Sequence, residues 1–145
     1  MKKKIKQNKH GRNIFELPSF DTKNGILMMA QNLTSNAKGA LPFDIQRVLV
    51  MKGMSLGDIR GGHTHHKTRQ ILFAVSGSCT VDMDNGHEKW SVTLDTFHKG
   101  IVLEPYVWHV MRGFTVNTIL LVLADSQYDE SDYIRDYEEF LDFLK

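Results

Sequence analysis

Three histidines within four positions are the residues of this sequence best suited to chemistry. His63, His65 and His66 stand in the stretch GGHTHHKTRQ, and one residue separates His63 from His65. Residues two apart on a β-strand point to the same face, so these two imidazoles would share a face while Thr64 points away. Imidazoles in this arrangement can bind a metal ion, transfer protons near neutral pH, or pack as ordinary hydrogen-bonded side chains.

Two glycines, a glutamine and a further histidine extend this pattern. Five residues separate Gly57 from the histidine pair, four separate the pair from Gln70, and six separate Gln70 from Gly77. Glycines at such positions are typical of bends at strand ends. His109, in the stretch GIVLEPYVWH, adds one more imidazole about forty residues downstream. Together these positions favour a shared functional pocket over unrelated packed histidines.

The elements that must position these residues are mostly β-strands. Short β-favouring runs alternate with turns from about residue 14 to residue 124, and no helical period persists through them. Asp84, Asn85 and Gly86 predict a hairpin turn, because Asn and Gly tolerate the positive φ of tight hairpins. This pattern predicts a sandwich or a barrel. Strands are predicted over residues 25–33, 43–51, 58–65, 70–77, 78–84, 88–94, 100–105, 108–114 and 117–124.

The end of the chain has a different period. In ESDYIRDYEEFLDFLK, residues 130–145, the apolar side chains recur at three- and four-residue spacings with acidic residues between them. This spacing predicts an amphipathic helix whose apolar face packs on the sheet. The predicted apolar face consists of Tyr133, Tyr137, Phe140, Leu141 and Leu144.

Length and composition limit the remaining possibilities. A chain of 145 residues without a Pro/Gly/Ser-rich linker predicts one domain, residues 14–145, after a basic N-terminal tail of residues 1–13. The net charge of +1 argues against nucleic acid as a partner. The sequence contains no run of about 20 apolar residues, so we expect no membrane segment. Cys79 is the only cysteine, which excludes an intrachain disulfide and fits a reducing cytoplasm.

The spacing around the histidine pair resembles the first motif of the cupins, which consists of a glycine, an HxH pair, a glutamate and a second glycine. Gln70 stands where that motif has its glutamate. GIVLEPYVWH resembles the second cupin motif and contributes His109, although Val107 replaces a glycine of that motif. The resemblance implies an all-β cupin fold, a jelly-roll barrel, here followed by a short C-terminal α-helix.

Gln70 decides which chemistry the resemblance implies. In metal cupins three histidines and a carboxylate hold a divalent ion. Gln70 is neutral, and its amide oxygen binds a cation less strongly than a carboxylate does. Three histidines alone can hold zinc, so a metal site stays open as an alternative. A metal-free histidine pocket is suited to accepting a proton and returning it, which points toward an isomerase.

Four stretches together resemble the sugar 3,4-ketoisomerase family of cupins: RGGHTHHKTRQILFAVSGSCTV, the WH pair ending in His109, LPFDIQRV, and ILLVLADSQYDESDYIRDYEEF. The resemblance implies a cofactor-free, metal-independent reaction that moves the carbonyl of dTDP-4-keto-6-deoxy-glucose from C4 to C3. The product would serve the biosynthesis of 3-amino-3,6-dideoxy sugars for surface glycans. The family also implies a homodimer that exchanges N-terminal strands, so residues 14–33 are expected to pack on the partner subunit.

The same resemblance gives roles to the histidines. His65, the second histidine of the HxH pair, is expected to be the base that removes the proton from C3. His63 would hold or relay that proton, and His109 would line the opposite wall of the pocket. The enediolate formed on the sugar needs a nearby hydrogen-bond donor or positive charge.

The nucleotide end of the substrate needs cationic groups, because guanidinium and ammonium groups bind diphosphates. Arg60, three residues before the HxH pair, is the first candidate, and Arg47 is a weaker one. Arg60 reaches the side of the histidines only if Gly61 and Gly62 form a β-bulge. Gln70 is expected to hydrogen-bond a sugar hydroxyl.

The sequence also departs from the family. Leu49, Val50 and Met51 stand where family members commonly carry aromatic residues, so a sugar contact from that strand is missing. Two other function classes stay open: a metal-dependent cupin enzyme, and a non-catalytic cupin that binds a nucleotide sugar without exchanging its protons.

Overall fold

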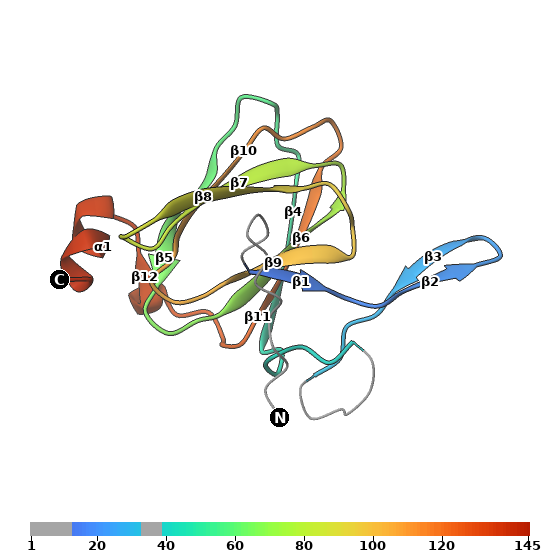
Figure 1. Ribbon diagram of the computed structural model, residues 1–145, viewed down its shortest axis with the longest axis horizontal. Helices are drawn as coiled ribbons and strands as arrows, with labels where there is room; N and C mark the ends of the chain where they lie inside the picture. The colour runs from blue at the N-terminus through green and yellow to red at the C-terminus, as the bar shows by residue number, and fades with distance from the viewer. Residues whose placement is uncertain (1–12, 33–38) are drawn as a thin grey trace.

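The structure is a computed structural model that describes residues 13–32 and 39–145 (Figure 1). The predicted N-terminal tail therefore lies outside the described residues except for Asn13. The predicted exchange segment lies inside them except for Leu33.

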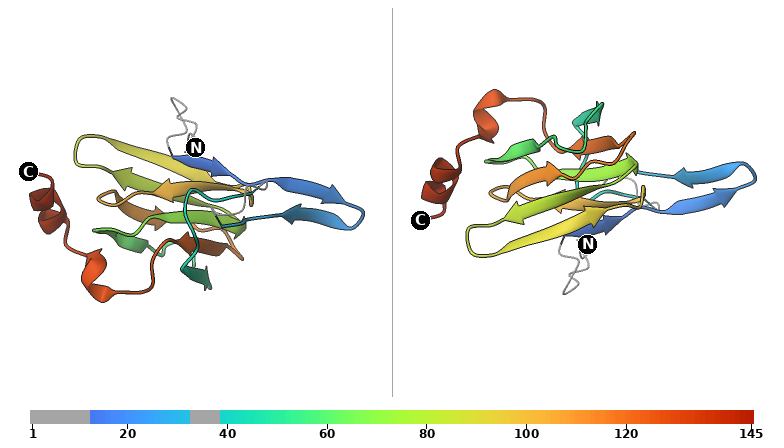
Figure 2. Two further views of the ribbon diagram at one scale, coloured as in Figure 1. Left: turned by 90° about the horizontal axis from the view of Figure 1, so that it is seen from below. Right: turned by 90° about the horizontal axis from the view of Figure 1, so that it is seen from above.

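Two five-stranded antiparallel sheets face each other, so the all-β prediction is confirmed (Figures 1 and 2). The first sheet has the order β1 (Ile14–Glu16), β9 (Lys99–Leu103), β6 (Gln70–Ser76), β11 (Ile119–Ala124), β4 (Arg47–Lys52). The second has the order β12 (Tyr133–Ile134), β5 (Arg60–His65), β10 (Trp108–Arg112), β7 (Cys79–Asp84), β8 (Lys89–Leu94). A separate hairpin is formed by β2 (Ser19–Thr22) and β3 (Gly25–Met28).

Alternate residues of the strands fill the space between the two sheets. Leu72 of β6 and Leu120 of β11 come from the first sheet, and Val81 and Met83 of β7 come from the second. All four side chains are almost completely buried. Burial of one such side chain contributes about 1.5 to 3 kcal/mol, so this layer is a main source of the stability that holds the two sheets in register.

The first sheet is buried on its outer face as well. Ile71 and Phe73 of β6 point away from the interior and pack with Leu17, Leu41 and other residues of the N-terminal region. A strand covered on both faces needs apolar residues at successive positions rather than at alternate ones. This explains why QILFAVS reads as one continuous apolar run.

Each of the nine predicted strands has a counterpart, with ends shifted by up to five residues. The predicted hairpin is confirmed: Asp84 of β7 pairs with Lys89 of β8, and Gly86 has a φ of 85°. The Asn85 side chain accepts hydrogen bonds from the N–H groups of His87 and Glu88, which stabilises this loop. The sequence did not predict β1, β2 or β12, which are two to four residues long.

The C-terminal helix is shorter than predicted. α1 spans Tyr137–Phe143, and the preceding segment forms a 3-10 turn, Glu130–Asp132, and then β12. The helix begins where the Asp136 side chain caps it by accepting a hydrogen bond of 2.9 Å from the N–H of Glu139. Phe140 is buried against the ring of Trp108 as expected. Tyr133, however, belongs to a strand and not to the helix face.

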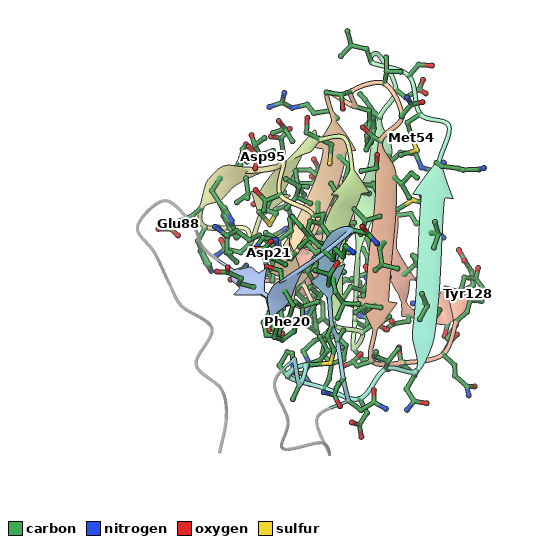
Figure 3. The ribbon with its side chains drawn as sticks, turned by 90° about the vertical axis from the view of Figure 1, so that its right-hand side faces the viewer. Phe20, Asp21, Met54, Glu88, Asp95 and Tyr128 are labelled. Carbon is green, nitrogen blue, oxygen red and sulfur yellow. The ribbon has the colours of Figure 1, made fainter. Side chains whose placement is uncertain are left out.

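The β2–β3 hairpin projects from the body of the molecule, at the end opposite to α1 (Figures 1 and 2). Ile26 and Leu27 on this hairpin are 58% and 53% exposed, and Phe20 is exposed beside Asp21 (Figure 3). Large apolar side chains are normally buried in a folded protein, so three of them on this hairpin form an exposed apolar surface. No helix in the described part of the chain has the length and apolar character needed to cross a membrane.

Candidate active site

The three predicted histidines lie together on two neighbouring strands. His63 of β5 pairs directly with His109 of β10, and their ring centroids are 4.7 Å apart. The ring centroid of His65 lies 5.2 Å from that of His63 and 6.3 Å from that of His109. The structure therefore brings the three histidines together, with His109 beside His63 rather than on an opposite wall as expected.

A β-bulge in β5 sets the direction of the side chains before His63. His109 pairs with His63 while the next residue, Val110, pairs with Gly61, so Gly62 is the extra residue. Gly61 and Gly62 have φ angles of 81° and 73°, which glycine adopts far more easily than other residues. Because of this bulge Arg60 and His63 line the same cavity. The bulge is the condition under which the sequence allowed Arg60 to lie on the side of the histidines.

The cavity has a volume of about 390 Å³, within the usual range for a small-molecule site. Its apolar wall comes from both sheets and includes Leu49, Met51, Leu72 and Met111. The polar groups on its wall are Arg60, His63, Gln70, His109, Tyr133 and Arg135. A few polar groups on a largely apolar surface are typical of a small-molecule site, where they fix the orientation of the ligand.

His65 lies behind this wall. It is 3% exposed and is not among the residues that line the cavity, whereas His63 and His109 are. Its Nε2 atom has no hydrogen-bond partner among the described residues. The predicted base is thus reached from the cavity past His63 and Tyr133, whose rings both contact it.

Tyr133 and Arg135 are cavity residues that sequence reasoning missed. Tyr133 of β12 pairs with His65 of β5, and its ring centroid lies 4.4 Å from that of His65 and 5.2 Å from that of His63. The Arg135 guanidinium lies 4.3 Å from the centroid of the Tyr133 ring and bonds to the carboxylate of Glu130. A two-residue strand is too short to show any period, and the spacing of Tyr133 fitted a helix equally well.

Burial keeps the histidines uncharged. Burial, then the neighbouring His63, lowers the pKa of His65 to about 4. Burial also lowers the pKa of His109 to about 3, and burial together with Arg135 lowers the pKa of His63. Removing an imidazole from water disfavours its charged form, and close neighbours cannot all be protonated. At neutral pH the site therefore presents neutral imidazoles that can accept a proton.

Asp132 holds the loop that follows the histidine pair. Its carboxylate accepts a hydrogen bond of 2.8 Å from the N–H of Lys67 and another from the Thr68 hydroxyl, and its carbonyl accepts one from the N–H of His66. The side chain is 4% exposed. Burial opposes ionisation of this carboxyl, but the hydrogen bonds from Thr68 and Lys67 hold its pKa below the ordinary value. Asp132 thus fixes the end of β5.

The remaining predicted binding residues have different positions. Gln70 is 6% exposed and lines the cavity. Arg60 is exposed, lines the cavity, and also borders a second hollow of about 570 Å³ that includes Lys52 and Asp58. Arg47 does not line the cavity, and its guanidinium lies 5.7 Å from the ring centroid of Tyr128, beside β4 (Figure 3).

A structural metal site needs several ligand side chains that converge on one point. In the described part of the chain no group of three His, Cys, Asp or Glu side chains is arranged to hold a metal ion. His109 Nδ1 lies 3.1 Å from the carbonyl oxygen of Val107 and is occupied by this hydrogen bond, so only Nε2 is available to another group.

The chain matches known proteins over most of its length. Residues 10–145 match the family described as FdtA: WxcM-like, C-terminal. The chain is 38% identical over 104 residues to a TDP-4-oxo-6-deoxy-alpha-D-glucose-3,4-oxoisomerase of Aneurinibacillus thermoaerophilus, covering 72% of this chain and 75% of that protein.

Two solved structures are similar in both fold and sequence. One is a histidine-to-asparagine mutant of a 3,4-ketoisomerase from Thermoanaerobacterium thermosaccharolyticum in complex with TDP-4-keto-6-deoxyglucose, with a TM-score of 0.83, 31% identity and coverage of 90% of this chain and 93% of that one. The other is a 3,4-ketoisomerase from Helicobacter canadensis, with a TM-score of 0.84, 31% identity and coverage of 90% and 95%. The chain therefore belongs to the FdtA/WxcM-like family of cupin isomerases.

Proposed function

We propose that the protein is a metal-independent dTDP-4-keto-6-deoxy-glucose 3,4-ketoisomerase. The observation that carries the proposal is the cluster of His63, His65 and His109, whose imidazoles are held neutral beside one cavity. The family membership and the substrate named for the Thermoanaerobacterium relative support the substrate class.

The reaction requires a base close to a carbon acid. The C4 ketone acidifies the hydrogen on C3, and a neutral histidine removes it to give an enediolate, which is then protonated at C4. We assign the base to His65, with His63 between it and the cavity as the group that holds or relays the proton. His109 forms the wall beside them. The guanidinium of Arg135, which lines the cavity, supplies positive charge for the enediolate.

The nucleotide end of the substrate is assigned to Arg60. Its guanidinium stands where the cavity meets the second hollow, so a sugar in the cavity would place its diphosphate toward this side chain. Gln70 is assigned to a sugar hydroxyl, because it is the buried amide on the cavity wall. Arg47 is the weaker candidate, because a substrate would have to reach it beyond the cavity wall.

The proposal includes no metal because of the side chains that would have to bind one. Gln70 is neutral, so it cannot offset the charge of a divalent ion as the carboxylate of a metal cupin does. Activity is therefore expected to survive treatment with a chelator.

We propose that the protein forms a homodimer through its N-terminal strands. The β2–β3 hairpin projects away from the body, and its exposed Phe20, Ile26 and Leu27 would be covered by a second copy (Figure 2). Ile26→Asp is expected to shift the protein toward the monomer in sedimentation analysis, because it buries a charge in that contact. Asp21→Asn, on the same hairpin, is the matched control and should leave the dimer intact.

The biological setting follows from the same assignment. The 3-keto product is suited to an aminotransferase that forms a 3-amino-3,6-dideoxy sugar for surface glycans. We place the reaction in the cytoplasm, which fits the buried, unpaired thiol of Cys79.

The proposal is tested by incubating the chelator-treated protein with dTDP-4-keto-6-deoxy-glucose in deuterated water and following C3 and C4 by NMR. Solvent exchange at C3 and a new 3-keto product are the expected results. Activity only after a metal is restored would favour the metal-dependent enzyme. Binding of the sugar without exchange under any metal condition would favour a non-catalytic binding protein.

A further inference from the structure

Isomerisation moves two protons, and the histidines account for only one of them. The carbon-bound proton leaves C3 and a proton arrives at C4. The hydroxyl on C3 must also lose its proton as it becomes a ketone, while the former ketone oxygen on C4 must gain one. This second transfer, between two neighbouring oxygens, needs a group that can donate and accept at the same time. The inference below rests on the proposed function.

Tyr133 is the residue whose position fits this second transfer. It lines the cavity, which His65 does not, and its ring contacts the rings of both His63 and His65. A substrate whose C3 lies within reach of the histidine pair therefore has its C3 and C4 oxygens near this side chain. A phenol hydroxyl is both a hydrogen-bond donor and an acceptor.

The hydroxyl of Tyr133 also differs from those of the other three tyrosines. Those of Tyr106, Tyr128 and Tyr137 bond to His66, Glu130 and Asp84 respectively. No described residue hydrogen-bonds to the hydroxyl of Tyr133, although its ring is held by the two histidines and by Arg135. The ring is thus fixed while the hydroxyl stays available for a ligand.

The neighbouring polar groups are less suited to the task. Arg135 has no acceptor and stays protonated, and two of its nitrogens already donate to Glu130. Gln70 carries separate donor and acceptor atoms on an amide that does not readily give up a proton. The histidine pair is occupied with the carbon-bound proton.

We propose that Tyr133 is a catalytic residue that relays the hydroxyl proton of the sugar from O3 to O4. As the bond from C3 to its hydrogen breaks and the C4 oxygen takes on negative charge, the phenol gives its proton to O4. The phenol oxygen then takes the proton from O3, which restores the tyrosine and leaves an enediolate with its negative charge on O3. Protonation at C4 by the charged histidine then gives the 3-ketone. Both protons and the electron pair are accounted for without any co-reactant.

Tyr133→Phe tests this role, because it keeps the ring and its contacts with the histidines and removes only the hydroxyl. General acid–base groups contribute about 10² to 10⁴ to a rate. We expect kcat to fall by about a hundredfold or more, with little change in KM. Exchange of the C3 hydrogen with deuterated water should fall less than product formation, so the ratio of exchange to product rises. A purely structural role would lower exchange and product together.

Tyr137→Phe is the matched control. Tyr137 lies on α1 and does not line the cavity, and its hydroxyl donates to Asp84 of β7, so its removal should leave both the rate and the ratio unchanged. If the wild-type protein neither exchanges nor converts the sugar, the proposed function fails, and the role of Tyr133 fails with it. If the wild type is active and Tyr133→Phe keeps the wild-type rate or ratio, the role of Tyr133 alone is overturned.

Discussion

Tyr133 lies directly opposite His65 in the antiparallel pairing of β12 with β5, and their ring centroids are 4.4 Å apart. The two residues are 68 positions apart in the sequence. This pairing brings a residue from the C-terminal segment to the histidine pair and closes one side of the cavity. The segment before α1 therefore contributes to the wall of the candidate active site rather than being a simple extension of the barrel.

His65→Asn is expected to abolish both C3 exchange and product formation, by about a thousandfold, because the amide cannot accept the proton. His63→Asn should slow both steps less if His63 only holds or relays the proton. The two variants are compared by NMR in deuterated water, with His87→Asn, an exposed loop histidine, as control. A larger loss in His63→Asn than in His65→Asn would assign the base to His63, which lines the cavity directly.

The pH profile should show the depressed pKa of His65. A base must be unprotonated, and burial holds the pKa of His65 at about 4, so kcat/KM should stay level from neutral pH down to about pH 5 and fall near pH 4. An unperturbed histidine would lose half its activity near its ordinary pKa of about 6.5. A profile that falls around pH 6.5 would contradict this prediction.

The same shifts affect stability. The pKa of His65 is lower in the folded chain than in the unfolded one, so the unfolded chain binds more protons at pH values between about 4 and the ordinary value of 6.5. Unfolding therefore becomes easier as the pH is lowered through this range. Circular dichroism across the same range is needed to separate loss of catalysis from loss of fold.

Gly61→Ala is expected to destabilise the protein more than Gly62→Ala. Both positions have positive φ, which costs another residue about 1 to 2 kcal/mol. A Cβ at Gly61 would also lie 2.8 Å from the carbonyl oxygen of His109, whereas a Cβ at Gly62 would meet nothing within 4 Å. Urea unfolding of both variants isolates this contact. Equal losses of free energy of unfolding would show that the backbone moves to accommodate the methyl group.

Asp132→Asn should lower the free energy of unfolding by about 1 to 3 kcal/mol, because its buried carboxylate holds the Lys67 N–H and the Thr68 hydroxyl. The comparison is Asp142→Asn, which removes an exposed carboxylate paired with Lys145 and should cost well under 1 kcal/mol. Thermal unfolding of the two variants measures the difference. Equal midpoints would show that Asp132 does not stabilise the end of β5.

Local sequence determined most of the framework. The alternation and turn residues predicted nine strands and the Asp84 to Gly86 hairpin, because these features depend on neighbours along the chain. The spacing of His63, His65 and Gln70 predicted the histidine pocket, because a strand projects alternate residues to one face. The glycine pair before His63 permitted the bulge for a similar local reason, because only glycine adopts its φ angles at low cost, but the sequence left open whether the bulge forms.

Tertiary structure decided the parts of the site that come from distant segments. Tyr133 and Arg135 reach the cavity because Tyr133 and Ile134 pair with β5, and such pairing between distant positions leaves no period in a two-residue strand. The position of His65 behind the wall and the low pKa values of the histidines follow from burial between the sheets, which depends on the whole fold. The sequence therefore determined which histidines could transfer protons, and only the folded chain decided which of them line the cavity.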